Sequence, residues 1–321
     1  MRFIPFGPEL DGVPHVVIGG RPRPDSALAL SHLPGVTSPP EFEADTTAEI
    51  VLRLLRSVHR TVHLDGIAAV TSERCDADSL LGVWSLLHPE EAADRAERVA
   101  DAARAGAFSV RWSAEAAQFA CWVRGFRRDE GLEDDGDAFG VMLPLVAGVL
   151  DNPRTADLYW IGEYSDLIHD GAMLNSGAVQ IEEYPDLDLS VMETPLWLHD
   201  LVRFSALSCF RLLTVRSENT FVLEYRRESG VRYHSRRPLP RLDLRPLGAR
   251  LNLFERNAGQ WRAEPVDSAA PRLFFDNGEG RPSPSALDAE TVIDEVRDFF
   301  RVNANRHDLQ WSPYSDGPAA S

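Results

Sequence analysis

Hydrophobic positions in the first half of the chain alternate between short continuous runs and helically spaced patterns. The runs at 13–18, 27–30 and 66–71 have the length and composition of buried strands. Other segments place apolar residues three and four positions apart, which is typical of helices; these are 50–58, 80–87, 89–106, 113–122 and 155–169. The alternation of strands and helices predicts a mainly parallel sheet covered by helices.

The pattern changes near Tyr184. We interpret 185–195 as an interdomain connection, and the apolar runs beyond it predict hairpin strands at 210–215, 220–225 and 231–235 and helices at 244–254 and 289–300. The fold class is therefore α/β. We expect an N-terminal domain at 1–184, a linker at 185–195, a smaller α+β lobe at 196–305 and a disordered tail at 306–321.

Composition narrows the class of protein. Of the 321 residues, 44% are hydrophobic and 26% are charged, as in a globular protein. The net charge of -17 argues against general nucleic-acid binding, because a phosphate backbone would be repelled. All 33 basic residues are arginine, which excludes mechanisms that use a Schiff-base or P-loop lysine.

Hydropathy and cysteine usage indicate the compartment. No run reaches the roughly 18 apolar residues that a membrane span needs, so we expect no membrane association. The segment after Met1 lacks the apolar core of a signal peptide, which predicts a cytoplasmic protein. The three cysteines are far apart and have no zinc-type spacing.

Two aspartates stand where a predicted strand ends and a helix begins. Asp76 and Asp78 follow the run 66–71, at the edge of a parallel sheet where ligands collect. In an extended segment both carboxylates would face one ion, and their oxygens suit Mn²⁺ or Mg²⁺. The alternative is a metal-free helix start, with Ser79 as the cap and Asp78 favoured by the helix dipole.

His32 is the histidine that we expect to assist these aspartates. It follows the predicted strand 27–30 and precedes Pro34-Gly35, so it belongs to the same sheet edge. The sequence thus predicts that Asp76, Asp78 and His32 act as both the metal ligands and the catalytic residues. A packing role for a single histidine is the alternative.

An arginine-rich segment lies in the C-terminal part. Nine arginines and three acidic residues fall between Arg226 and Arg256, which leaves a local charge of 9 − 3 = +6. Guanidinium groups bind phosphate in bidentate fashion, so Arg232, Arg236 and Arg237, with Ser235, are the predicted substrate-binding residues. The alternative is that these arginines form ion pairs with acidic residues of the N-terminal domain.

The run Glu73-Arg74-Cys75-Asp76-Ala77-Asp78-Ser79 resembles the first metal-binding motif of the DHH phosphoesterases, whose exopolyphosphatase and prune-like members carry a similar Asp-x-Asp-Ser run. The segments 231–237 and 242–248 resemble the strand, turn and helix of the substrate domain in that superfamily. This resemblance implies a two-lobed fold, manganese bound by the two aspartates, and attack of a metal-held hydroxide on phosphorus.

The sequence also departs from that pattern, since no Asp-His-His triplet occurs. The whole chain is similar, in addition, to an uncharacterised and mostly actinobacterial family of unknown function. Two functions remain open: a metal-dependent phosphoesterase for a small phosphorylated or nucleotide substrate, and a catalytically inactive protein that binds such a ligand. A third alternative is a partner protein that docks through the acidic loop 129–137.

Overall fold

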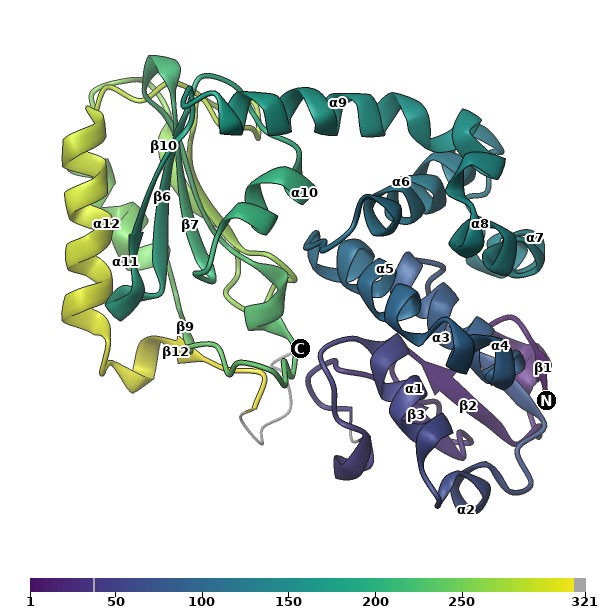
Figure 1. Ribbon diagram of the computed structural model, residues 1–321. Helices are drawn as coiled ribbons and strands as arrows, with labels where there is room; N and C mark the ends of the chain where they lie inside the picture. Colours follow the sequence, from purple (N-terminus) through teal and green to yellow (C-terminus); the bar gives the residue numbers. More distant parts are fainter. Residues whose placement is uncertain (37, 315–321) are drawn as a thin grey trace. The chain divides into compact units, whose positions relative to one another are not determined.

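The computed structural model describes residues 1–36 and 38–314. The chain divides into two compact units (Figure 1). The first unit contains Met1–Ile168 together with Asp200–Ser205 and Arg232–Arg236, and the second contains His169–His199, Ala206–Val231 and the chain from Arg237 onward. The segment 232–236 therefore belongs to the N-terminal unit, although the sequence assigned it to the C-terminal lobe.

The first unit is built on a parallel sheet, as predicted, and the sheet has four strands, of which the sequence predicted three. Its strands are β1 (Arg2–Phe3), β2 (His15–Ile18), β3 (Leu28–Leu30) and β4 (Ala69–Thr71). They lie in the order β1-β4-β2-β3, and every pair is parallel. Because the strands are parallel, their carboxyl ends meet at one edge, and His32 and Asp76 follow two of these ends.

Helices pack against this sheet and against one another. They are α1 (Thr47–Arg56), α2 (Arg60–Leu64), α3 (Ala77–Leu87), α4 (Pro89–Asp94), α5 (Ala96–Phe108), α6 (Ala114–Asp129), α7 (Asp135–Met142) and α8 (Val146–Asp151). Helix α3 contacts β1, β2 and β4, and α1 contacts β3, while α5 packs on both helices. The short helix α10 (Asp200–Arg203) also belongs to this unit, and α9 (Asp157–Asn175) contains the boundary between the units.

Two helical predictions need correction. The segment 89–106 forms two helices, α4 and α5, because the backbone of Arg95 between them departs from helical geometry, with φ −111° and ψ 15°. The acidic segment 129–137 is only partly a loop. Asp134 accepts a hydrogen bond from the backbone N–H of Asp137 and so starts α7 as its N-cap.

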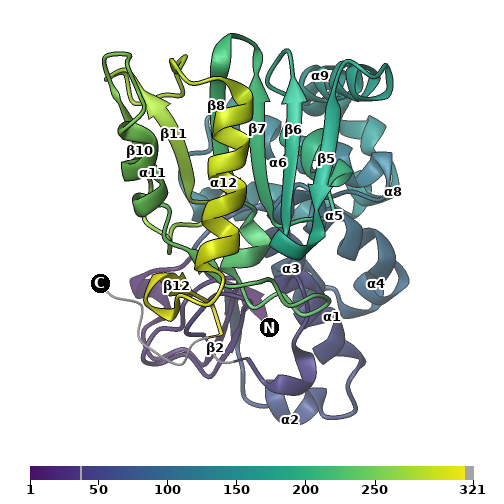
Figure 2. The same cartoon turned by 90° about the vertical axis from the view of Figure 1, so that its left-hand side faces the viewer.

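The second unit holds a six-stranded mixed sheet. Its strands are β5 (Gln180–Tyr184), β6 (Leu189–Thr194), β7 (Arg211–Arg216), β8 (Thr220–Tyr225), β10 (Gln260–Ala263) and β11 (Arg272–Asp276), in the order β10-β11-β8-β7-β6-β5. Only β6 and β7 are parallel. Helices α11 (Arg245–Asn252) and α12 (Ala289–Asn303) cover one face of this sheet, where they enclose a hydrophobic core (Figure 2).

Three expectations for the C-terminal half differ from the structure. The segment 185–195 is not a simple connection, because it contains β6, whose residues Leu189 and Met192 are fully buried. Residues 231–235 form no strand; the backbone N–H of Arg232 instead binds the carbonyl of His32 at 2.8 Å. The expected tail is ordered as far as 314, since β12 (Gln310–Trp311) pairs with β9 (Arg241–Leu242), and residues 315–321 lie outside the described part.

A buried arginine organises the second unit. The Arg241 side chain is fully buried and donates to Ser229 Oγ and to the carbonyls of Val266, Ser268 and Ala269. Burial lowers the pKa of its guanidinium to about 10. A β-carbon at Gly230 would lie 2.4 Å from this guanidinium, so the close approach requires glycine there.

None of the helices in the described ranges combines the length and the apolar character that a membrane span needs.

Candidate functional site

The first turn of α1 is capped by two different segments of the chain. Thr46 and Glu49 form a capping box, in which the Thr46 hydroxyl accepts from the Glu49 N–H and the Glu49 carboxylate accepts from the Thr46 N–H. The two remaining early donors, the N–H groups of Thr47 and Ala48, bind the Asp78 carboxylate at 2.9 and 2.8 Å. Asp78 thus satisfies two buried N–H groups in the first turn of a helix that lies thirty residues earlier.

The two predicted metal ligands, Asp76 and Asp78, form hydrogen bonds with different helices. Asp76 is exposed and is the N-cap of α3, where its carboxylate accepts from the Ser79 N–H at 2.8 Å. Asp78 is only 4% exposed and turns toward α1. The two carboxylates do not point the same way because Ala77 already begins the helix, so the two-residue repeat of an extended segment does not apply.

The segment that leads into Asp76 is also held by side chains of α6 and α7. The backbone N–H of Cys75 binds Asp135, and the Cys75 carbonyl accepts from Arg127, each at 2.8 Å. Asp135 and Arg127 also form an ion pair with each other. Burial raises the pKa of the Cys75 thiol to about 12, so this cysteine is not a reactive thiolate at neutral pH.

His32 does lie beside Asp78, as the sheet-edge argument predicts. Its Nδ1 is 3.8 Å from Asp78 Oδ2 and has no hydrogen-bond partner within the described residues. Burial lowers the pKa of His32 to about 4, which keeps the imidazole neutral. Burial, helped by the charge of Asp76, raises the pKa of Asp78 to about 7, against the opposing hydrogen bonds from Ala48 and Thr47.

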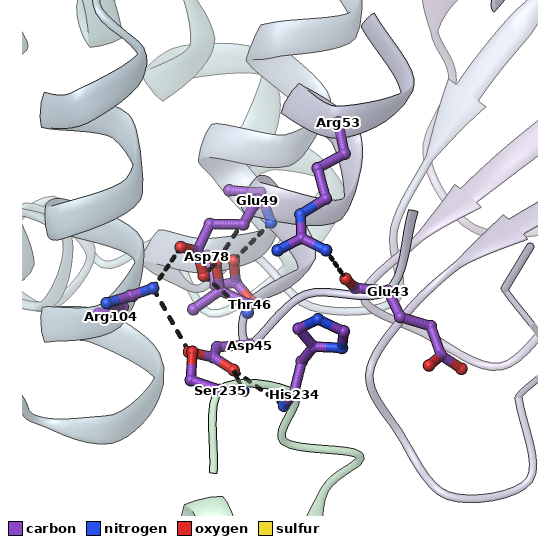
Figure 3. A network of polar contacts seen from close by, with 10 residues as sticks. Glu43, Asp45, Thr46, Glu49, Arg53, Asp78, Arg104, His234 and Ser235 are labelled. Carbon is purple, nitrogen blue, oxygen red and sulfur yellow. Dashed lines mark hydrogen bonds and ion pairs between the residues drawn. The ribbon is translucent and has the colours of Figure 1, made fainter. Parts of the chain in front are cut away.

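Part of the arginine-rich segment, residues 232–236, binds Asp45 near this edge of the sheet (Figure 3). Asp45 is almost fully buried, and it accepts hydrogen bonds from the N–H groups of His234 and Ser235 at 2.9 and 2.7 Å and from the Ser235 hydroxyl. Arg104 approaches the same carboxylate at 3.4 Å and binds Glu49 at 2.6 Å. A connected set of charges therefore joins α1, α5 and the segment 232–236.

Sequence reasoning missed Asp45, Glu49 and Arg104. The spacing Thr46-x-x-Glu49 was a readable signal, because a threonine followed three residues later by glutamate marks a helix start. No local pattern marked Asp45, because His234 and Ser235, which bind it, lie about 190 residues away in the chain.

A small cavity lies at the same edge of the sheet. It is lined by His32, Ser38, Glu43 and Arg232 among others, and its volume is about 10 Å³. That is room for roughly one water molecule. Arg232 is held at its rim by an ion pair with Glu43 at 2.8 Å.

Most of the nine clustered arginines have structural partners. Arg226 pairs with Glu228, Arg245 with Asp243 and Arg250 with Glu295, and Arg241 is buried as described above. Of the predicted substrate-binding residues, Arg232, Ser235 and Arg236 lie in the first unit. Arg237 lies in the second unit, where its guanidinium stacks on the Tyr314 ring at 4.5 Å from the ring centre.

The metal-ligating side chains that the structure brings together are too few for a divalent cation. Within the described ranges, no group of three His, Cys, Asp or Glu side chains is placed to hold a metal ion. The carboxylate of Asp78 is engaged by two backbone N–H groups, and Asp76 is engaged by its own helix. His32 and Asp78 together provide two metal-ligating side chains, whereas an oxygen-liganded Mn²⁺ or Mg²⁺ needs about six ligands.

Comparison with known proteins gives one match. The model of a family described as "Family of unknown function (DUF6687)" matches residues 1–311. No curated protein matches, and no solved structure matches. None of these comparisons connects the chain with the DHH phosphoesterases.

Proposed function

The chain belongs to the DUF6687 family, and we propose that it binds a small phosphorylated ligand at the carboxyl edge of its parallel sheet, without a metal-dependent reaction. The observation that carries this proposal is the anchoring of the segment 232–236 by Asp45. This anchoring brings Arg232 and Arg236 into the same unit as the sheet edge where open α/β sheets bind ligands.

The chemistry of the edge favours an anion. Guanidinium groups bind phosphate oxygens through paired N–H donors, and Arg236 is exposed to solvent. The neutral His32 imidazole adds a polar group without adding negative charge. The cavity beside His32 is too small for a phosphate, so the ligand binds outside it, along the exposed part of the segment.

Calorimetric titration with pyrophosphate and with AMP, in EDTA, tests this proposal. We expect Arg232→Gln and Arg236→Gln each to weaken binding by about 10-fold or more, because each removes a charge-assisted hydrogen bond to phosphate. Arg154→Gln is the matched control, since Arg154 is exposed in the same unit and lies outside the site. Absence of binding by both compounds, or equal affinities in all variants, contradicts the proposal.

Phosphoester hydrolysis with Mn²⁺ or Mg²⁺ is the second candidate function, in line with the resemblance to the DHH phosphoesterases. The proximity of His32 Nδ1 and Asp78 favours it, because these two residues are the part of the predicted ligand set that does meet. The same titrations with Mn²⁺, followed by an assay of phosphodiester turnover, decide between the two. Turnover that is lost in Asp76→Asn and Asp78→Asn would establish the hydrolase and remove the metal-free proposal.

A further inference from the structure

A second pocket lies in the first unit, away from the sheet edge. It is formed where α1, α2 and α4 meet, and it has a volume of about 120 Å³. Its walls are apolar: Leu52 and Leu55 come from α1, and Pro89 and Ala93 come from α4. An engineered protein cavity of about 150 Å³ with apolar walls holds benzene, so this pocket has room for a small branched alkyl group.

Three charged side chains complete the lining: Arg56 at the end of α1, Arg60 at the start of α2, and Glu90 in the first turn of α4. None of the three forms a hydrogen bond or an ion pair through its side chain within the described part of the chain. Helix dipoles explain why an arginine stands at the end of α1 and a glutamate at the start of α4. All three side chains are exposed to solvent, so a ligand at the mouth of the pocket can reach them.

The arrangement complements one class of ligand. An α-amino acid carries a carboxylate, which two guanidinium groups can bind, and an ammonium group, which a carboxylate can bind. An apolar amino acid adds a side chain that gains free energy by leaving water for the apolar walls. A ligand with a carboxylate alone would leave Glu90 without a partner and would be repelled by it.

We propose that this pocket binds a free branched-chain amino acid, with the alkyl group between α1 and α4, the carboxylate at Arg56 and Arg60, and the ammonium group at Glu90. The site is separate from the phospho-ligand site proposed above, because none of Arg232, Ser235 and Arg236 lines this pocket. Its test is therefore independent of that proposal.

Ligand-observed NMR and calorimetry with L-leucine test the site directly. For a ligand of this size we expect a Kd between about 1 µM and about 10 mM. Two truncated compounds test the two charged groups of leucine one at a time: 4-methylpentanoate lacks the ammonium group, and 3-methylbutylamine lacks the carboxylate. We expect both to bind at least about 10-fold more weakly than leucine, because each lacks one of the charge-assisted contacts that leucine makes.

Variants of the protein give the complementary test. We expect Arg56→Gln, Arg60→Gln and Glu90→Gln each to weaken leucine binding about 10-fold, and Ala93→Leu to abolish it by filling the pocket. Matched controls are Arg154→Gln and Glu97→Gln, which change exposed residues of the same types in the same unit. Circular dichroism of Ala93→Leu checks that the fold is retained, and the charge variants test the site if it is not.

Three results would overturn the inference. The first is no binding of leucine by the wild type up to about 10 mM. The second is an affinity for 4-methylpentanoate equal to that for leucine, which would remove the role of Glu90. The third is a loss of affinity in the control variants as large as that in the pocket variants.

Discussion

Ser235 donates both its backbone N–H and its hydroxyl to the carboxylate of Asp45, which lies 190 residues earlier in the chain. Asp45 is only 2% exposed, so these bonds replace water that the carboxylate has lost. Arg104 supplies the nearby positive charge. This buried carboxylate therefore anchors the segment 232–236 in the first unit, together with the contacts of Arg232 to His32 and Glu43.

Replacement of Asp45 should therefore destabilise the first unit. In Asp45→Asn the amide NH₂ faces the N–H groups of His234 and Ser235, and Arg104 loses part of its counter-charge. We expect the free energy of unfolding to fall by about 2–4 kcal/mol, the range found when one partner of a buried charged contact is removed. Urea denaturation followed by circular dichroism measures the change.

Asp25→Asn is the control for this prediction. Asp25 is exposed and pairs with Arg23 at the surface, so its replacement should cost less than about 0.5 kcal/mol. Equal unfolding midpoints for the two variants would show that the Asp45 contacts contribute little.

The His32–Asp78 pair predicts a specific dependence of stability on pH. Folded His32 is neutral above about pH 4, whereas an unfolded histidine keeps its proton up to about pH 6.5. Its contribution to stability therefore rises with pH across this range, because the unfolded state binds the extra proton. Folded Asp78 keeps its proton up to about pH 7, whereas an unfolded aspartate loses it near 3.8, so its contribution falls with pH.

The two contributions oppose each other between about pH 4 and pH 6.5. Replacing one of the two residues should therefore reveal the pH dependence that the other residue contributes. Relative to wild type, the stability of His32→Gln should fall by about 1.4 kcal/mol per pH unit, and that of Asp78→Asn should rise with the same slope. Urea unfolding at several pH values measures both slopes. Curves parallel to wild type in both variants would mean that burial does not shift the pKa of either side chain.

The buried Arg241 is the most sensitive position that we predict in the second unit. Arg241→Met keeps much of the volume but leaves the carbonyls of Val266, Ser268 and Ala269 without their donor. We expect a loss of about 3–5 kcal/mol, visible as a lower thermal midpoint. Arg256→Met is the control, because Arg256 is exposed, and its midpoint should stay near that of wild type. A similar midpoint for Arg241→Met would mean that the loop carbonyls find other partners.

Two glycines give a paired test of helix packing. A β-carbon at Gly125 in α6 would lie 1.8 Å from the carbonyl oxygen of Tyr159 in α9, so Gly125→Ala must push these helices apart. We expect a loss of about 1–3 kcal/mol. Gly140 is exposed in α7 with no atom near its β-carbon position, so Gly140→Ala should stabilise the protein by about 0.5–1 kcal/mol. Changes of the same sign in both variants, measured by thermal unfolding, would contradict this account.

The sequence by itself determined the fold class and part of the local structure. The apolar runs at β2, β3 and β4 and the helical spacing of α1, α3 and α12 are read directly from neighbouring residues, because each element buries a face with a fixed period. The position of His32 and Asp76 at one sheet edge also followed from the sequence, since parallel strands bring their carboxyl ends together.

Tertiary structure decided what the polar side chains do. Asp78 turns to the backbone of α1, Asp45 binds Ser235, and Arg241 binds a loop that follows it by about 25 residues. A carboxylate or guanidinium leaves water only where donors or acceptors replace its hydration. Those partners come from distant segments, so no local pattern in the chain could specify them.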